Sequence, residues 1–211
     1  QARQRVIVIG IRKDLGLIPE FPAKKYAKDV TVNEAISDLP TIHAAEGTET
    51  QKYTKKPKNA YQEFMRKKSL SVKNHIAMRH TQRLIDRFKA IKNGQGLVDV
   101  WETHGAVQRG NPTKKSTVKF SQNNQRLHGD KPAPTIAASF QSNFIHPKLD
   151  RNFTAREGAR LQSFPDNFEF KGMRTKMSWE KGLSQYQQIG NAVPPLLAKA
   201  IGLSIKKSLN N

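Results

Sequence analysis

The stretch that says most about the fold lies at residues 151–166 and reads RNFTAREGARLQSFPD. Thr154 and Glu157 stand three residues apart, just ahead of a run of small and apolar residues. This is the spacing of a capping box, in which each side chain bonds the backbone N–H of the other residue. The pattern predicts a helix from Thr154 to about Gln162. Arg156 and Arg160 would tie that helix to acidic neighbours, so we interpret the segment as scaffold.

Similar local signals predict further helices elsewhere in the chain. A second capping box, Thr31 with Glu34, opens a short helix that runs through Leu39 and stops at Pro40. Pro194 and Pro195 suit the first turn of a helix that runs to about Leu209. Apolar residues at helical spacing predict two more helices, at residues 60–69 and 81–91.

Strands and loops are predicted from β-branched runs and from polar, aperiodic stretches. Residues 5–11, RVIVIGI, have the composition of a strand buried on both faces in a mostly parallel sheet. Residues 44–58 lack periodicity and are interpreted as a linker or mobile loop. Three further strands are expected, at residues 97–101, 116–120 and 135–140.

The charge of the chain is lopsided and unevenly placed. The 37 Lys and Arg residues outnumber 17 Asp and Glu, which gives a formal net charge of +20. Residues 51–128 hold 18 basic and four acidic residues, whereas residues 1–50 balance at seven of each. A single cluster of lysines is usually a solvated surface. A surplus of 14 charges interleaved with aromatic residues favours a nucleic acid as partner.

The composition also excludes several kinds of chemistry. With no cysteine, the chain has no disulfide, no thiolate nucleophile and no Cys-based metal site of its own. It contains no apolar run of membrane-spanning length and no signal-peptide pattern at its start. Because Gln1 leads directly into the apolar run without an initiating Met, we expect a piece of a longer protein, or upstream residues that the structure omits.

Three segments, in order, resemble the last conserved blocks of the DNA cytosine-5 methyltransferases. The first is QARQRVIVIG at residues 1–10, which is similar to the family's Gln-x-Arg-x-Arg strand. The second is the 151–166 segment, and the third is QYQQIGNAVP at residues 185–194. Each alone is a weak signal, but their order and spacing around a variable basic insert are specific. The resemblance covers roughly residues 1–40 and 126–211, while 45–125 match only as the family's variable region.

The resemblance implies a role for the two arginines of the first block. Methylation at C5 requires the cytosine to leave the base stack and enter a pocket. In the family, the second Arg of the block stabilises the charge that develops on the ring, and that residue is Arg5 here. Arg3 lies two residues away, on the same side of a strand, so both are candidate catalytic residues. Without the resemblance, both would be surface arginines at the edge of a strand.

The resemblance also implies contacts with DNA and with the methyl donor. Thr135 corresponds to a family Thr that touches the phosphate beside the extruded base. Arg126 is our candidate for reading guanine in a groove, with a phosphate contact or a plain surface position as the alternatives. The S-adenosylmethionine pocket would be closed at one end by Asn191, Ala192 and Val193; Tyr186 and Gln188 of the same block need only pack. Further DNA contacts are expected from the basic region, at Arg109, Lys114 and Lys115.

No metal site is expected. His75 and His80 are five residues apart, but no Cys and no nearby carboxylate pair accompanies them. Asn74 and His75 are better suited to cap the following basic helix or to contact DNA.

We therefore expect an α+β chain that combines the edge of a Rossmann-like α/β catalytic domain with a small mixed target-recognition domain. Residues 1–43 would belong to the catalytic domain, 44–150 would recognise DNA, and 151–211 would return to the catalytic domain. The expected partners are double-stranded DNA and the N-terminal half of the methyltransferase, which would supply the catalytic Cys; alone, the chain would be inactive. No membrane partner is expected, and the enzyme would work in the cytoplasm on DNA. The alternative is a basic DNA-binding module without methyl-transfer activity, or a fragment that has lost its partner.

Overall fold

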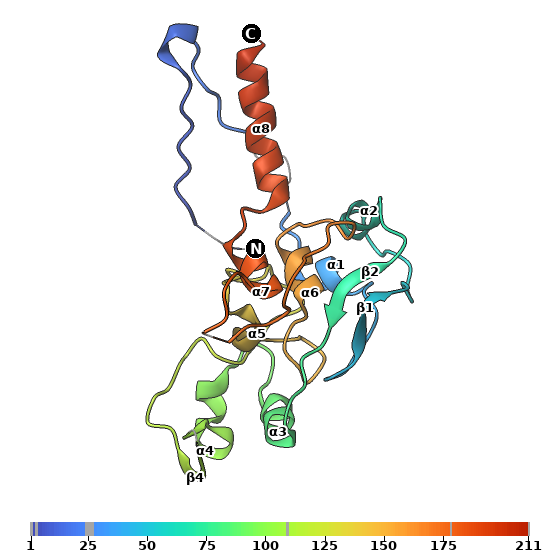
Figure 1. Cartoon of the computed structure of the whole chain (residues 1–211), viewed down its shortest axis with the longest axis vertical. Coiled ribbons are helices and arrows are strands. Elements are labelled where there is room, and N and C mark those ends of the chain that lie inside the picture. Colours follow the sequence, from blue (N-terminus) through green and yellow to red (C-terminus); the bar gives the residue numbers. More distant parts are fainter. Residues whose placement is uncertain (1, 3, 24–27, 109, 178, 211) are drawn as a thin grey trace.

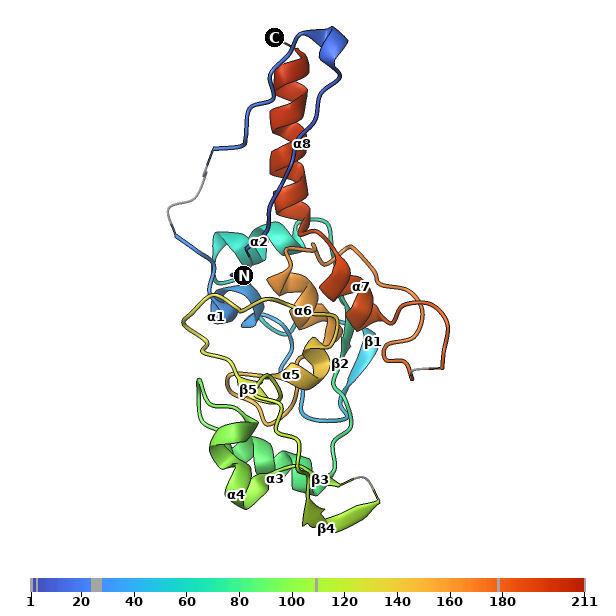
Figure 2. The ribbon, with the colours of Figure 1, turned by 90° about the vertical axis from the view of Figure 1, so that its left-hand side faces the viewer.

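The computed structural model describes residues 2, 4–23, 28–108, 110–177 and 179–210, and helix α6 (Ala155–Leu161) lies at the centre of its body. Every residue of α6 is buried. Around it pack α1 (Val32–Ile36), α7 (Gln185–Asn191) and strand β2 (Val72–Ile76). The long helix α8 (Pro195–Leu209) projects away from this body, and residues 4–23 extend beside it (Figures 1 and 2).

Within the described residues, the strands form three separate pairs rather than one sheet. β1 (Gly47–Gln51) runs antiparallel to β2, with Gly47 opposite Ile76 and Gln51 opposite Val72. A second antiparallel pair joins β3 and β4, and β5 runs parallel to β6. The remaining elements are η1 (Lys13–Leu15), α2 (Ala60–Arg66), α3 (Gln82–Ala90), η2 (Leu97–Val100), α4 (Trp101–His104), β3 (Val107–Gln108), β4 (Asn111–Lys115), β5 (Gln125–Arg126), α5 (Phe140–Asn143) and β6 (Phe144–Ile145).

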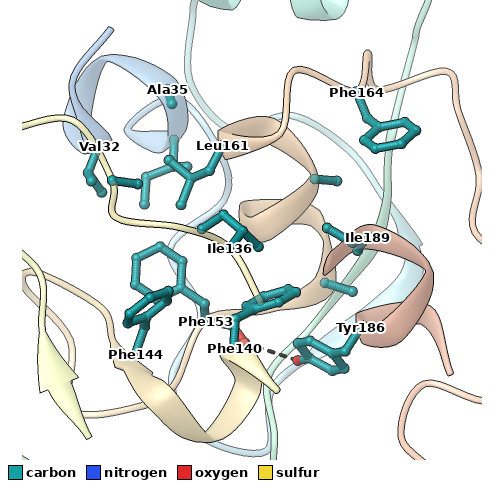
Figure 3. Close-up of a cluster of buried hydrophobic side chains, with 14 of the residues drawn as sticks. Val32, Ala35, Ile136, Phe140, Phe144, Phe153, Leu161, Phe164, Tyr186 and Ile189 are labelled. Carbon is teal, nitrogen blue, oxygen red and sulfur yellow. Dashed lines mark hydrogen bonds between the residues drawn. The ribbon is translucent and has the colours of Figure 1, made fainter. Parts of the chain in front are cut away.

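The main hydrophobic core surrounds α6, draws on α1, α5 and α7, and is rich in aromatic rings (Figure 3). The rings of Phe140 and Tyr186 lie 4.8 Å apart in a tilted arrangement. The hydroxyl of Tyr186 donates to the backbone oxygen of Phe153 at 3.0 Å, so this buried phenol keeps a hydrogen-bond partner. Ile136 and Ile189 are also completely buried. Residues far apart in the sequence are thus fixed against one another by packing.

A buried ion network ties α6 to the elements on its other side. Arg160 donates to both carboxylate oxygens of Asp166 at 2.6 Å and to Asp38 at 3.1 Å. Tyr53 donates to the same Asp166 carboxylate, and Tyr61 donates to the backbone oxygen of Arg160. Because Arg160, Asp38 and Asp166 are all fully buried, each charge depends on its partners for the solvation that water would otherwise give.

The start of α6 carries a second buried network. Both capping-box bonds between Thr154 and Glu157 are present, and Arg151 binds the Glu157 carboxylate at 2.7 Å and 2.8 Å. His75 bonds Pro40 through Nε2 and Thr154 through Nδ1, both at 2.9 Å. Since a carbonyl oxygen only accepts, Nε2 carries the proton and Nδ1 accepts the Thr154 hydroxyl. His75 is therefore a buried neutral linker, and the prediction that Asn74 and His75 cap a helix or contact DNA is wrong.

The locally signalled helices are confirmed. Both capping boxes are formed, α2 and α3 lie inside the predicted ranges, and α8 begins at Pro195. The strands are different. Residues 5–11 form no strand, and Val6 and Val8 are 92% and 86% exposed, because no other described strand pairs with them. Residues 97–101 are helical, 116–120 and 135–139 are irregular, and the predicted linker contains β1.

The structure is thus a mixed arrangement of helices and strands, and the division into catalytic and recognition parts stays a proposal. One feature bears on it: the main core draws on residues from all three predicted parts, among them Val32, Val72 and Tyr186.

We predict that Asp166→Asn lowers the free energy of unfolding by about 3 kcal/mol, because it leaves Arg160 buried with too little compensating charge. Urea denaturation followed by circular dichroism measures this change. Asp14→Asn is the matched control, since Asp14 pairs with Arg12 on the surface, and should change stability by less than about 1 kcal/mol. Equal effects of the two substitutions would contradict the assignment.

Candidate functional site

Residues 132–138 form a segment on which the chain's separate motifs converge. The backbone N–H of Ala2 donates to the oxygen of Ala133 at 2.8 Å, and the hydroxyl of Thr135 donates to the oxygen of Ala2 at 3.2 Å. The predicted phosphate contact, Thr135, therefore lies against the stretch that leads into the predicted catalytic arginines. Arg3 lies outside the described residues, so its predicted role stays a prediction.

Arg5 is exposed near this segment. Its guanidinium donates to the oxygen of the adjacent Gln4 at 2.7 Å, a bond within its own stretch of backbone. The long side chain is thus available to a ligand from outside, in contrast to the buried arginines of α6.

The third motif meets the same segment through Gly190 of α7. A Cβ atom built on Gly190 would lie 2.5 Å from the oxygen of Ala137 and would also overlap the backbone nitrogen of Ala138. Only a residue without a side chain permits this approach. Gln162, from the second motif, donates to the oxygen of Ile189 at 3.0 Å. The first and third motifs therefore contact residues 132–138, and the second motif contacts the third.

The predicted cofactor residues follow immediately at the end of α7. Asn191 and Val193 are exposed, Val193 at 62%, and Ala192 is half-buried and donates its N–H to Ile189. An exposed amide beside an exposed apolar side chain suits one edge of a site for S-adenosylmethionine. Neither of the two cavities described, of about 210 and 290 Å³, is lined by these residues.

The prediction for Arg126 is corrected by the structure. Its side chain is buried and donates to four backbone oxygens, at Phe88, Ile91, His146 and Leu149, and to the carboxylate of Asp150 at 2.7 Å. With its donors committed to the protein, Arg126 cannot read a base in this conformation. Its function is to hold α3 against the loop after β6.

Lys114 and Lys115, two further predicted DNA contacts, lie on β4 at one end of the molecule (Figure 2). Lys114 is exposed. Lys115 binds the Glu102 carboxylate at 3.1 Å and the backbone oxygen of the same residue at 2.6 Å, so part of its charge is already compensated. Arg109 lies outside the described residues.

Sequence reasoning did not find Arg87, whose side chain joins α3 to the end of α4. Its guanidinium donates to the oxygens of His104 at 2.6 Å and Gly105 at 2.9 Å, and to the side chain of Asn124. No spacing in the sequence distinguishes it from an exposed basic residue, because its acceptors come from distant loops.

Two buried ionisable groups near the start of α6, Glu157 and His146, have shifted pKa values. Burial alone would raise the pKa of Glu157, but the charge and hydrogen bonds of Arg151 outweigh it and hold the pKa below its usual range. Burial lowers the pKa of His146 to about 4, against the opposing pull of Glu157. Nδ1 of His146 also accepts from the N–H groups of Lys148 and Leu149, which requires the neutral ring. These groups therefore support the structure rather than exchange protons near neutral pH.

Among the residues described, no three His, Asp or Glu side chains are grouped so that they could hold a metal ion. Within the same residues, no helix combines the length and the apolar composition needed to cross a bilayer.

Comparison with known proteins supplies the family. Residues 1–207 match the family described as C-5 cytosine-specific DNA methylase. The chain is 58% identical over 215 residues to the type II methyltransferase M.DdeI of Desulfomicrobium norvegicum, a match that covers 100% of this chain and 52% of that relative. The chain therefore belongs to the C-5 cytosine-specific DNA methylase family.

Two further matches are a second methyltransferase sequence and a solved structure. The type II methyltransferase M.AquIB of a Picosynechococcus strain is 34% identical over 145 residues, which cover 67% of this chain and 93% of that relative. A crystal structure assigned to a prophage-encoded DNA modification methyltransferase of E. coli has a TM-score of 0.66 at 23% identity and supports the fold alone; the match covers 95% of this chain and 54% of that one. The chain thus spans about half the length of M.DdeI and of this solved structure, but nearly all of M.AquIB.

We predict that Gly190→Ala loosens the contact between α7 and residues 132–138 and costs about 1–3 kcal/mol of stability, because the added methyl group overlaps backbone atoms. Gly202→Ala is the matched control. Gly202 is also helical, but a Cβ there meets nothing within 4 Å, so the change should be neutral or stabilising by up to about 1 kcal/mol. Thermal or urea unfolding compares the stability of the two variants. An unchanged stability of Gly190→Ala would show that α7 and residues 132–138 are not closely packed.

Proposed function

We propose that this chain forms the target-recognition and C-terminal portion of a DNA cytosine-5 methyltransferase. The observation that carries the proposal is that residues 132–138, which include Thr135, contact Ala2 of the first motif and Gly190 of the third. Extrusion of a cytosine requires groups that hold the backbone beside the base and groups that meet the base itself. The segment brings a candidate for each role into one place.

In this proposal, the chain's residues bind and orient the reacting cytosine. The Thr135 hydroxyl, which now bonds Ala2, turns to a phosphate oxygen beside the extruded nucleotide. Arg5 places its guanidinium against O2 of the ring and stabilises the negative charge that develops there. Arg3 lines the same pocket, and Asn191, Ala192 and Val193 form one edge of the cofactor site. S-adenosylmethionine, when bound, supplies the methyl group that C5 receives.

The thiolate that attacks C6 and the carboxyl group that protonates N3 would come from a second stretch of polypeptide. The chain has no cysteine, so it contains no thiolate of its own. Residues 4–23, which extend beside α8, expose apolar side chains that such a partner would cover (Figure 2). Val6 and Val8 on this arm are almost fully exposed, as is Ile18, and α8 exposes Leu203 and Leu209. Exposed apolar groups gathered in this way are typical of a surface that another protein covers.

The arm and the helix hold each other in place, which favours a preformed docking surface. Glu20 accepts from Lys207 at 3.0 Å, and its backbone bonds Ser204 and Ser208. The coverage of M.AquIB supports the same division, because that methyltransferase consists almost entirely of the region matched here. The alternative of a basic DNA-binding module without methyl-transfer activity is not favoured by the family match.

We predict that the chain alone transfers no methyl group, and that mixing it with the part of M.DdeI that it does not match gives transfer to duplex DNA. In the mixture, Arg5→Ala should lower the rate of transfer about 100-fold or more, as loss of a charge-stabilising donor does in other enzymes. Arg12→Ala is the control, since Arg12 binds only the neighbouring Asp14 at the surface of the same arm. Incorporation of a labelled methyl group into DNA measures all four samples. Robust transfer by the chain alone, or an active Arg5→Ala mixture, would refute the assignment.

We predict that Lys114→Ala weakens binding to every duplex tested by a similar factor, because Lys114 contacts phosphates rather than bases. The slope of log affinity against log salt concentration should fall by about 0.9, the value for one neutralised phosphate. Lys206→Ala on α8, at the opposite end of the molecule, is the control and should leave the slope unchanged (Figure 1). Fluorescence anisotropy of labelled duplexes gives both quantities, and a change in sequence preference with an unchanged slope would contradict a phosphate contact.

A further inference from the structure

The loop between α6 and α7 exposes an unusual combination of side chains. We call the described residues 172–177 and 179–183 the Trp179 loop; it projects beside α7 (Figure 2). Trp179 is 79% exposed, and Met177 and Leu183 are more than half exposed. Leaving an indole in water is unfavourable, and large exposed apolar side chains gathered on one loop mark a binding surface.

The loop is braced, so its side chains are presented in a defined arrangement. Lys176 donates to the backbone oxygens of Glu180 at 2.6 Å and Gly182 at 2.8 Å. The Glu180 carboxylate accepts from the N–H of Met177 at 2.5 Å. At the base, the N–H of Gln185 donates to the oxygen of Met173 at 2.8 Å, which closes the loop onto the start of α7.

The charge of the loop is positive once these internal bonds are counted. Lys176 and Glu180 serve the bracing, which leaves Arg174 and the exposed Lys181 for an external anion. Nη1 of Arg174 is buried and has no hydrogen-bond partner among the described residues. A buried guanidinium nitrogen without an acceptor is costly, and an incoming anion that draws the side chain outward relieves that cost. Cations that flank an exposed indole suit a partner with both phosphates and flat apolar surfaces.

Helix α7 fixes the distance from this loop to the candidate site. The loop closes at the first residue of α7, and Gly190 at the other end packs on residues 132–138. A helix of seven residues is about 10 Å long at 1.5 Å per residue. At about 3.4 Å per base pair, that is about three base pairs along a duplex. A duplex held at Thr135 is therefore within reach of the Trp179 loop.

We propose that the Trp179 loop is a second DNA-binding element, separate from the basic hairpin. Trp179 packs against sugar and base surfaces that flank the extruded cytosine, while Lys181 and Arg174 bind the adjacent phosphates. The inference rests on the proposed function for the position of the DNA. It adds a contact on the α7 side of the site, whereas β3 and β4 lie at the far end of the body (Figure 1).

The two tryptophans of the chain make a direct test possible. Trp101 is 5% exposed and Trp179 is 79% exposed, so acrylamide quenching of the full chain reports chiefly on Trp179. Addition of duplex DNA should protect the indole and reduce the quenching constant at least twofold. In Trp179→Phe, the weak quenching of Trp101 should not respond to DNA, while affinity stays within about twofold because an aromatic ring remains. Trp179→Ala should weaken binding about fivefold or more, as loss of an aromatic contact to a base does.

A charge variant tests the phosphate contact independently. Lys181→Gln should lower the salt slope of binding by about 0.9, with Lys206→Gln as the surface control that leaves it unchanged.

The outcomes separate this inference from the proposed function. If the chain binds duplex but Trp179 remains equally accessible, the loop inference is overturned and the proposed function stands. If protection appears only when the unmatched part of M.DdeI is added, the loop is a protein interface and the inference fails. If the chain binds no duplex even at low salt, both the inference and the DNA-binding part of the proposed function are contradicted.

Discussion

The interaction on which the rest of the structure depends is the neutralisation of Arg160 inside the protein. Its guanidinium is shared between Asp38 and Asp166, so one side chain joins the helix at the centre to the segments before and after it. Such a cluster is stable only when every member is present, because a lone buried charge costs several kcal/mol. The centre of the molecule is therefore held by directional bonds with defined partners as well as by apolar packing. The defined position of α6 in turn fixes the motifs that pack on α6 and α7.

The candidate site is assembled mainly by backbone contacts. Ala2 pairs with Ala133 through main-chain atoms, and Gly190 meets Ala137 with no side chain between them. Contacts of this kind hold the local geometry to a fraction of an ångström and leave the reactive side chains unencumbered. Asn191 is exposed at the end of α7, and Arg5 is exposed on the extended stretch that follows Ala2. In the proposed function these groups meet an extruded base and a cofactor, and support that is complete before the ligand arrives favours binding.

The sequence predicted those features whose physical cause is local. The capping boxes at Thr31 and Thr154 need only three or four consecutive residues, and both helices formed where expected. Strands depend on partners elsewhere: polar β1 exists because β2 pairs with it, and the apolar run at 5–11 is not a strand because no described segment does. Residues 97–101 became helical because Asp99 accepts the N–H of Gly96 and closes a turn. For the site, motif resemblance indicated that Thr135 belongs near the first block, but no sequence pattern separates the buried Arg126 from an exposed arginine. Its acceptors lie on five distant residues and come together only in the folded chain.

The exposed apolar side chains of residues 4–23 and of α8 affect how the chain behaves in solution. Each large one among them would gain about 1.5–3 kcal/mol on full burial. The burial of these side chains would stabilise binding to another protein, and the same burial favours the clustering of isolated molecules. The +20 charge opposes clustering at low ionic strength, because like-charged molecules repel over roughly a Debye length. Salt shortens that range and therefore favours clustering. Because the same apolar patch drives both clustering and the binding of a covering surface, a change that strengthens this binding lowers colloidal stability.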